Sequence, residues 1–298
     1  MKTIEPLKKG DTVALAATAR KVSPEEMAPA IERLRAWDLN VLIPEGLYAE
    51  ENQFAGSDEH RAALLQGLLD NPEVKAILCC RGGYGTVRIV DRLDFSHFEQ
   101  NPKWIVGYSD VTVLHSHLHT LGYPTIHGTM PINFGPTESA ATESLRRVLF
   151  GEKVDYQWDS CWREGTAEGL LVGGNLSILY SLCGSRSQID TRGKILLIED
   201  LDEYLYHIDR MMQNLKRNGM FEGLAGLVVG GMTDMHDNTI PFGRTAEQIV
   251  REAVADYTFP VVFEAPFGHL GDNNLAIPMG IKMRLESSNS KKVRIFAP

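Results

Sequence analysis

Short apolar segments alternate with amphipathic helical stretches through the first half of the chain, and this alternation constrains the fold more than any other feature. Ser23 and Glu26 form a capping-box pattern that opens one helix, and another helix is expected over residues 57–69. The apolar segments, interpreted as strands, cover residues 13–17, 39–43, 76–80 and 104–106. Such alternation predicts parallel strands joined by crossover helices. We therefore expect an α/β fold whose N-terminal domain, residues 1–135, contains a doubly wound, mostly parallel sheet.

The second half of the chain has a different texture. Proline, glycine, threonine and serine accumulate over residues 136–165, which are expected to be a connecting segment. Residues 166–298 mix apolar segments, helical stretches and an alternating stretch at 282–296 that is typical of paired β-strands. This part is expected to be a second, mixed α+β domain that is partly barrel-like.

Composition excludes several classes of protein. The 298 residues are 43% hydrophobic, which is enough apolar material for two domains of roughly 150 residues. A formal charge of -9 without a basic patch of domain size argues against a nucleic-acid partner. No run of about 18 apolar residues occurs, so no membrane span is expected. Residues 1–11 lack the pattern of a signal peptide, which predicts a cytoplasmic protein.

Cysteine and histidine spacing gives no indication of a metal site. The four cysteines form no C-x-x-C pair and are expected to be reduced thiols. His115 and His119 share a helix face at i,i+4 spacing that could bind a metal, but no third ligand of a suitable kind is nearby. These histidines are therefore expected to lie on a polar helix flank, and neither a metal nor a cofactor is expected.

A glycine-rich turn follows the predicted strand at residues 76–80. It reads Arg81-Gly82-Gly83-Tyr84-Gly85, and its glycines allow positive φ angles and a close approach of backbone N–H groups to a ligand oxygen. The turn matches neither a dinucleotide-binding fingerprint nor a P-loop. Taken alone, a turn of this kind is more often structural than functional.

A second strand end carries a candidate nucleophile, Ser109. The segment Gly107-Tyr108-Ser109-Asp110 lies between a predicted strand and a predicted helix, which is the arrangement of a nucleophile elbow. The G-x-S-x-G pattern is incomplete, because Val111 stands where the second glycine would be. The alternative is that Ser109 or Asp110 only caps the following helix, and this tetrapeptide alone favours that alternative.

A nucleophilic serine needs a base and an acid that orients the base. His269 lies in a glycine-containing loop after the strand expected at residues 261–264, and Glu199 closes the strand expected at residues 194–198. A loop histidine without a role and a solvated acidic helix cap are the respective alternatives.

Taken together, the motifs resemble the LD-carboxypeptidase family of serine peptidases. This family includes the murein tetrapeptide carboxypeptidases and the microcin C immunity peptidases, and the resemblance covers nearly the whole chain. The motifs that carry it are Phe54-Ala55-Gly56 with Arg61, Arg81-Gly82-Gly83-Tyr84-Gly85, Gly107-Tyr108-Ser109-Asp110, Gly173-Gly174-Asn175-Leu176, Ile198-Glu199-Asp200 and Phe267-Gly268-His269.

The resemblance implies a role for each candidate residue. Ser109 would be the nucleophile, His269 the general base, and Glu199 the acid that orients the imidazole. These three residues come from the two predicted domains, so the site is expected at the domain interface.

The resemblance also implies an oxyanion hole. Its donors would be the backbone N–H of Asp110 and that of Gly82 or Gly83. Further residues of the shared motifs, expected to bind the substrate, are Arg81, Tyr84 and Asn175.

The substrate implied by the resemblance is a small peptide with a C-terminal D-amino acid, such as the muropeptide tetrapeptide of cell-wall recycling. One alternative is a microcin C-type hydrolase that cleaves a peptide-nucleotide amide. A further alternative is a non-catalytic protein that binds a small ligand at the glycine turn. Family members are often dimeric, so a homodimer is possible. Two departures from the family pattern, Thr18 and Thr129, lie near strand ends and bear on the substrate preference.

Overall fold

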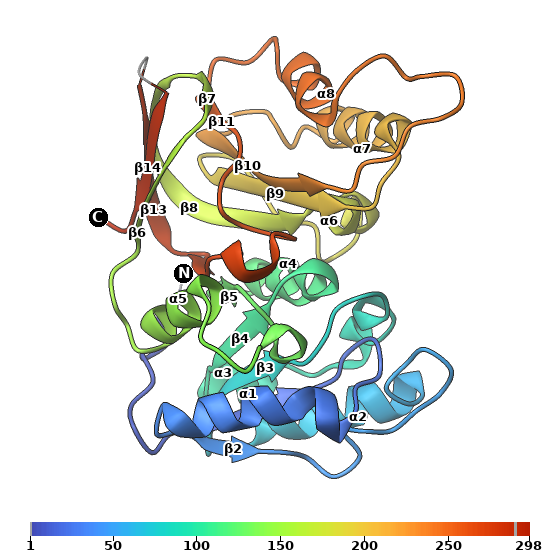
Figure 1. Ribbon diagram of the computed structural model, residues 1–298, viewed down its shortest axis with the longest axis vertical. Coiled ribbons are helices and arrows are strands. Elements are labelled where there is room, and N and C mark those ends of the chain that lie inside the picture. Colours follow the sequence, from blue (N-terminus) through green and yellow to red (C-terminus); the bar gives the residue numbers. More distant parts are fainter. Residues whose placement is uncertain (1, 289–290) are drawn as a thin grey trace.

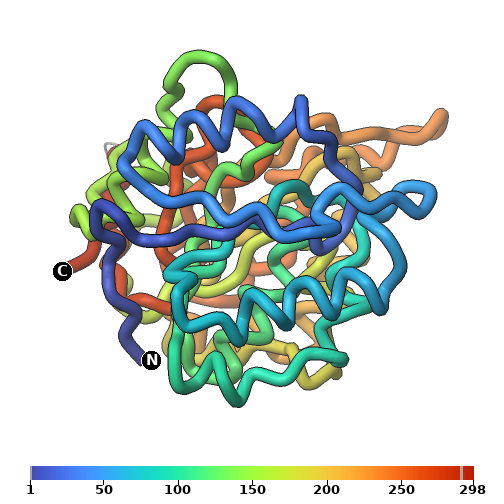
Figure 2. Tube along the Cα trace, turned by 90° about the horizontal axis from the view of Figure 1, so that it is seen from below, coloured from blue at the N-terminus to red at the C-terminus, as the bar shows by residue number. Residues whose placement is uncertain are grey.

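A computed structural model describes residues 2–288 and 291–298 of the chain. The fold has two parts, each built on its own β-sheet, and Figure 1 shows the N-terminal part below the C-terminal part. The two ends of the chain lie on the same side of the molecule (Figures 1 and 2). Within the described residues, no helix combines the length and apolar character that crossing a bilayer requires.

The first sheet has the strand order β12-β5-β4-β3-β1-β2. Its neighbouring strands are parallel except for β12, which is antiparallel to β5. The strands are β1 (Thr12–Ala16), β2 (Asn40–Leu42), β3 (Val74–Cys79), β4 (Trp104–Gly107), β5 (Thr125–His127) and β12 (Ile277–Met279). The expected mostly parallel sheet is therefore confirmed.

Helices cover both faces of this sheet. Val13 and Leu15 of β1 pack into the core that contains α1, whereas Ala14 and Ala16 pack into the core that contains α2. Successive strand residues point to opposite faces, so this division is that of a doubly wound fold. The helices of this part of the chain are α1 (Pro24–Ala36), α2 (Asp58–Asp70), α3 (Ser96–Gln100), α4 (Thr112–Thr120) and α5 (Ala140–Leu149).

The second sheet is mixed, with the order β6-β14-β13-β8-β9-β10-β11-β7. Strands β8 to β11 are parallel, and the remaining neighbours are antiparallel. The strands are β6 (Asp155–Asp159), β7 (Cys161–Arg163), β8 (Gly165–Asn175), β9 (Ile195–Leu201), β10 (Gly226–Thr233), β11 (Val261–Val262), β13 (Lys282–Ser287) and β14 (Lys292–Phe296).

This second sheet curls without closing. Its edge strands β6 and β7 are separated by Ser160 alone, so the chain itself brings the two edges together. Because the described strands include no β6–β7 ladder, the sheet is no closed barrel. One face packs against α6 (Leu176–Leu182), α7 (Leu205–Arg217) and α8 (Ala246–Ala253).

Two regions differ from the texture expected from the sequence. The expected connection at residues 136–165 contains α5, β6 and β7 rather than irregular chain. In addition, β12 lies in the C-terminal half of the chain but completes the first sheet by pairing with β5. Main-chain hydrogen bonding decides which sheet β12 joins. The pattern of apolar residues in the sequence does not predict that choice.

Helix α4 lies between the two parts, next to β8 and α6. Every residue from Thr112 to His119 is buried, and α6 contributes Ile178 and Leu182 to the same core. The expectation of a polar flank for His115 and His119 is therefore wrong, because both imidazoles face strands β4 and β5 of the first sheet. Within the part of the chain that the structure describes, each imidazole has one hydrogen-bond partner: His115 Nε2 pairs with Gly107 O at 2.9 Å, and His119 Nε2 pairs with the Thr125 hydroxyl.

Burial of His115 predicts a loss of stability in acid. Burial lowers its pKa to about 4, so between pH 6.5 and 4 the unfolded chain takes up a proton that the folded chain excludes. This group alone should cost about 3 kcal/mol of unfolding free energy over that interval. Urea unfolding of a His115→Gln variant, whose amide can still donate to Gly107 O, should show a shallower decline.

The exposed His97 provides the matched control. His97→Gln should leave the acid dependence of unfolding as it is in the natural chain, since the His97 side chain is largely exposed. An equal decline in His115→Gln and the natural chain would contradict the role given to His115.

Candidate active site

Ser109 lies at a sharp turn between β4 and α4. Its φ is 62°, in the left-handed region that costs a residue with a side chain roughly 1–3 kcal/mol. Gly107 has a φ of 157°, and a Cβ at that position would lie 2.8 Å from Val111 Cγ2. The turn is therefore tight, and it holds Ser109 at the carboxyl end of a parallel strand, where open sheets place their sites.

Ser109 and Asp110 do not cap the helix that follows. Among the residues with a described structure, no side chain caps either the short 3-10 turn Ser109–Val111 or α4 with a hydrogen bond. Asp110 is buried instead, and its carboxylate accepts a hydrogen bond from the Thr86 backbone N–H at 2.9 Å. The capping alternative is thus wrong, and Asp110 ties the serine turn to the end of the glycine turn.

The glycine turn lies directly against Ser109. A Cβ on Gly82 would be 3.1 Å from Ser109 Oγ, and a Cβ on Gly83 would collide with the Arg20 side chain at 2.3 Å. Gly83 has a φ of 105° and Gly85 a φ of 145°, so a side chain at either position is strained as well as crowded. The glycines of residues 81–85 are therefore required because this turn approaches the turn that carries Ser109 and the Arg20 side chain closely.

A buried arginine, Arg61, holds the glycine turn in place through hydrogen bonds. Arg61 Nη1 donates to Thr18 O at 2.6 Å and to Gly85 O at 3.0 Å, while Nη2 forms an ion pair with Asp58. The guanidinium also lies 4.9 Å from the Phe54 ring centroid. No role was assigned to Arg61 from the sequence. Its place beside the Phe54-Ala55-Gly56 motif was the signal in the sequence that could have indicated one.

Glu199 and His269 form a buried pair in the second part. His269 Nδ1–H donates to Glu199 Oε2 at 2.7 Å, and the His269 backbone N–H points to the same oxygen at 3.3 Å. Glu199 is fully buried, and the His269 side chain is 13% exposed. Gly268 makes this approach possible, because a Cβ there would lie 2.5 Å from Oε2.

Electrostatics favour the protonated imidazole at this pair. Burial lowers the pKa of His269, but the hydrogen bond and charge of Glu199, with a smaller effect of Asp200, outweigh burial and raise the pKa above its ordinary value. Among the described residues, Glu199 Oε1 has no hydrogen-bond partner. Nε2 of His269, the ring nitrogen that is not bonded to Glu199, can accept a proton, and the charge of Glu199 stabilises the resulting imidazolium.

Asp200 and Asn175 connect this pair to α4. Asn175 Nδ2 donates to Asp200 Oδ1 at 3.0 Å, and the Asn175 backbone N–H donates to Thr112 Oγ1 at 3.0 Å. Burial and the charge of Glu199 raise the pKa of Asp200 to about 7. Asn175 is itself buried and also caps α6, so its side chain is occupied within the protein.

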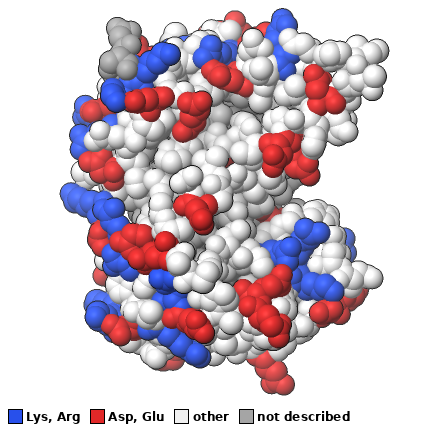
Figure 3. Space-filling view, viewed as in Figure 1, with Lys and Arg blue, Asp and Glu red and all other residues white. Residues whose placement is uncertain are grey.

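The two parts meet at a hollow that opens on one side of the molecule, with acidic and basic side chains on its rims (Figure 3). Tyr108, beside Ser109, packs edge to face on His269 with ring centroids 4.8 Å apart. Within the described residues, no hydrogen bond joins Ser109 to His269. Tyr84 is 48% exposed, and Arg81 is partly exposed and paired with Glu26.

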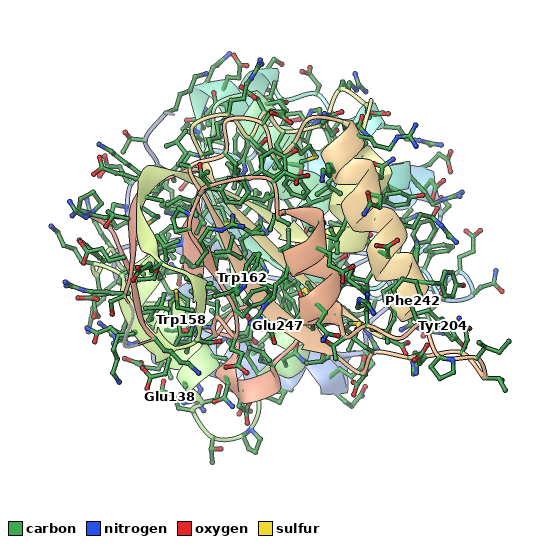
Figure 4. All side chains as sticks on the ribbon, turned by 90° about the horizontal axis from the view of Figure 1, so that it is seen from above. Glu138, Trp158, Trp162, Tyr204, Phe242 and Glu247 are labelled. Atoms are coloured by element: carbon green, nitrogen blue, oxygen red, sulfur yellow. The ribbon has the colours of Figure 1, made fainter. Side chains whose placement is uncertain are left out.

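Two aromatic side chains of the second part lie on the side of the molecule where the hollow opens. Tyr204 and Phe242 lie toward the side that carries the hollow (Figure 4), and the Tyr204 ring contacts His236 of the loop before α8. Among the residues that the structure describes, no group of three or more His, Cys, Asp or Glu side chains could hold a metal ion. The chemistry that this arrangement supports is that of a serine with a buried carboxylate–imidazole pair.

Comparison with known proteins agrees with both halves of the fold. The chain matches the LD-carboxypeptidase N-terminal domain over residues 12–128 and the LD-carboxypeptidase C-terminal domain over residues 168–285. It is 36% identical to the probable murein peptide carboxypeptidase of Bacillus subtilis, over 96% of this chain and 92% of that protein.

Solved structures show the same fold. The muramoyltetrapeptide carboxypeptidase from Oxalobacter formigenes superposes with a TM-score of 0.87 at 27% identity, covering 96% of this chain and 98% of that chain. The microcin C7 self immunity protein bound to aspartyl sulfamoyl adenosine gives a TM-score of 0.86 at 22% identity, covering 99% and 98%.

Removal of the buried Arg61 guanidinium should destabilise the fold. In Arg61→Met the carbonyls of Thr18 and Gly85 lose their donor while staying buried, so the free energy of unfolding should fall by about 3 kcal/mol. Arg88 bonds to the same Asp58 from a half-exposed position, and Arg88→Met should cost at most about 1 kcal/mol. Equal stabilities of the two variants in urea unfolding would contradict the structural role of Arg61.

Proposed function

Because the chain belongs to the LD-carboxypeptidase family and is a serine carboxypeptidase, we propose that it hydrolyses the amide bond before a C-terminal D-amino acid. The proposed reaction converts a muropeptide tetrapeptide into the tripeptide. One observation carries it above all: the buried hydrogen bond between His269 and Glu199, which lies against the strained turn that holds Ser109. A carboxylate, an imidazole and a serine in this order are the parts needed for acyl transfer.

In the proposed mechanism, Ser109 Oγ attacks the carbonyl carbon of the scissile amide. His269 accepts the hydroxyl proton on Nε2, the ring nitrogen that Glu199 leaves free. Glu199 holds the imidazole in the required tautomer and stabilises the imidazolium. His269 then donates the proton to the leaving amine, and water hydrolyses the acyl-enzyme by the same route in reverse.

The proposed oxyanion hole uses backbone groups. The N–H of Asp110 follows the nucleophile, and an N–H of Gly82 or Gly83 comes from the turn that lies against Ser109. The Arg61 and Asp110 side chains hold this turn in place from buried positions. Donors fixed before the reaction stabilise developing charge well, and loss of one donor typically costs about 100- to 1,000-fold in rate.

Arg81 and Tyr84 are proposed to contact the substrate, because both are open to solvent on the glycine turn. Arg81 could meet the terminal carboxylate after exchanging its exposed pairing with Glu26. Asn175, the third residue expected to bind substrate, has its side chain engaged by Asp200 and the start of α6. Its proposed contribution is to keep the strand that carries Glu199 in register.

A microcin C-type amide hydrolase is the second candidate. The fold shared with the microcin C7 self immunity protein, whose solved complex holds aspartyl sulfamoyl adenosine, favours this alternative. The sequence alternative of a non-catalytic binder fits less well, because such a protein has no use for a buried carboxylate–imidazole pair next to the serine turn. The homodimer and the cytoplasmic location stay predictions, which light scattering and cell fractionation would decide.

Loss of the Ser109 hydroxyl should abolish turnover. We expect Ser109→Ala to release no D-alanine from the tetrapeptide while its thermal unfolding matches that of the natural chain. Ser181→Ala, at an exposed position on α6, should keep full activity. A panel of L,D-, D,D- and L,L-linked peptides with an acyl-sulfamoyl nucleotide identifies the substrate class, and substantial hydrolysis by Ser109→Ala would rule out the nucleophile assignment.

The pH dependence should report the Glu199–His269 pair. Only neutral His269 can accept the serine proton, so kcat/KM should rise with pH through an apparent pKa higher than that of an ordinary histidine. Glu199→Gln removes the charge that raises the pKa of His269, so the rise should shift to lower pH with a smaller maximum rate. Glu203→Gln breaks a similar contact with His207 and should leave the profile unchanged. An unshifted profile in Glu199→Gln would contradict the pairing.

A further inference from the structure

The Tyr108 ring contacts the candidate base across the domain interface. Its centroid lies 4.8 Å from that of His269, with the two planes at 63°. Within the described residues, this is the one aromatic pair that joins residues 1–135 to residues 166–298. Tyr108 is also the residue before Ser109 in the chain. The contact therefore links the imidazole to the backbone that carries the candidate nucleophile.

Glu199 alone leaves the orientation of the imidazole incompletely determined. One hydrogen bond to Nδ1 fixes a single ring atom, and the plane of the ring can still turn about the line to Oε2. The backbone on either side of the ring is held, because the Gly268 N–H donates to Asn274 Oδ1 at 2.8 Å and the His269 carbonyl accepts from Thr233 Oγ1 at 3.3 Å. The freedom that remains is rotation of the side chain about its own bonds. A second contact on the ring limits this rotation and so the direction in which Nε2 points, and the Tyr108 ring provides one.

Tyr108 is itself held firmly. It is 7% exposed, and its ring packs on the buried His127 of β5 with centroids 5.9 Å apart. Its hydroxyl makes one long contact, 3.4 Å to Asn133 Oδ1. The aromatic ring is thus fixed between two imidazoles, and the hydroxyl contributes little to that placement.

We propose that Tyr108 is a positioning residue whose ring sets the plane of the His269 imidazole, so that Nε2 faces Ser109. This inference rests on the proposed function, because it assigns Tyr108 a part in activating Ser109. It also gives the segment Gly107-Tyr108-Ser109-Asp110 a second role: the same turn carries the nucleophile and orients its base. The effect acts through His269 and requires no contact between Tyr108 and the substrate.

The first test measures how fast a fluorophosphonate labels Ser109 and, separately, kcat and KM for D-alanine release. Tyr108→Leu should reduce the labelling rate and kcat by about 10- to 100-fold with KM changed less than about twofold, because misplacement of a reacting group by about 1 Å costs up to roughly 100-fold. Tyr108→Phe retains the ring and should keep at least a third of both rates. Equal rates in Tyr108→Leu and the natural chain would overturn the proposal.

The chain contains a matched control in Tyr180. Its ring packs edge to face on His207 at 5.9 Å and 89°, and His207 Nδ1 bonds to Glu203 at 2.6 Å, which repeats the same three side-chain types away from Ser109. Tyr180→Leu should leave labelling and turnover unchanged. A loss equal to that of Tyr108→Leu would show that general destabilisation, and not ring orientation, causes the effect.

A measurement on the natural chain covers the case in which Tyr108→Leu does not fold. Nuclear Overhauser contacts between the ring protons of Tyr108 and His269 should be present, and the Nδ1 proton shared with Glu199 should give one sharp downfield signal. Absence of those ring contacts overturns the proposal. If Ser109 resists labelling and no peptide is cleaved while the ring contacts are present, the proposed function fails and the orientation of His269 by Tyr108 stands.

Discussion

The burial of helix α4 between the two sheets is the constraint on which the site depends. Its residues Thr112 to His119 have no face left for solvent, so the helix fixes the distance between the carboxyl end of β4 and the strand that carries Glu199. Thr112 in its first turn accepts a hydrogen bond from the backbone of Asn175. The serine turn and the carboxylate–imidazole pair belong to different sheets, and this shared helix is what places them against each other.

The alternation of strand residues divides two neighbouring carboxylates between different tasks. Glu199 and Asp200 follow each other on β9, so their side chains point to opposite faces. Glu199 meets His269, and Asp200 accepts from Asn175 and from the start of α6. Each carboxylate is buried, and the charge of Glu199 contributes to the raised pKa of Asp200. The strand thus places one acid at the candidate site and uses the other to hold the strand in position.

The sequence predicted the features that depend on local residue patterns. It did not predict those that depend on tertiary contacts between distant segments. The strand–helix alternation predicted the doubly wound sheet, and the family resemblance selected Ser109, Glu199 and His269. His115 and His119 of α4 were wrongly expected on a polar flank, because their i,i+4 spacing does not show that this face of the helix packs on β4 and β5. The roles of Arg61 and Tyr108 arise from contacts with residues distant in sequence, which spacing cannot indicate.

Strand β12 links the two parts of the fold, because a segment from the C-terminal part of the chain forms an edge strand of the first sheet. It completes the first sheet at β5, although residues on both sides of it belong to the second part. A fragment that ended before the second sheet would leave β5 as an open edge, with unpaired N–H and C=O groups exposed to other chains. Recombination between relatives would therefore have to carry this strand together with the first sheet.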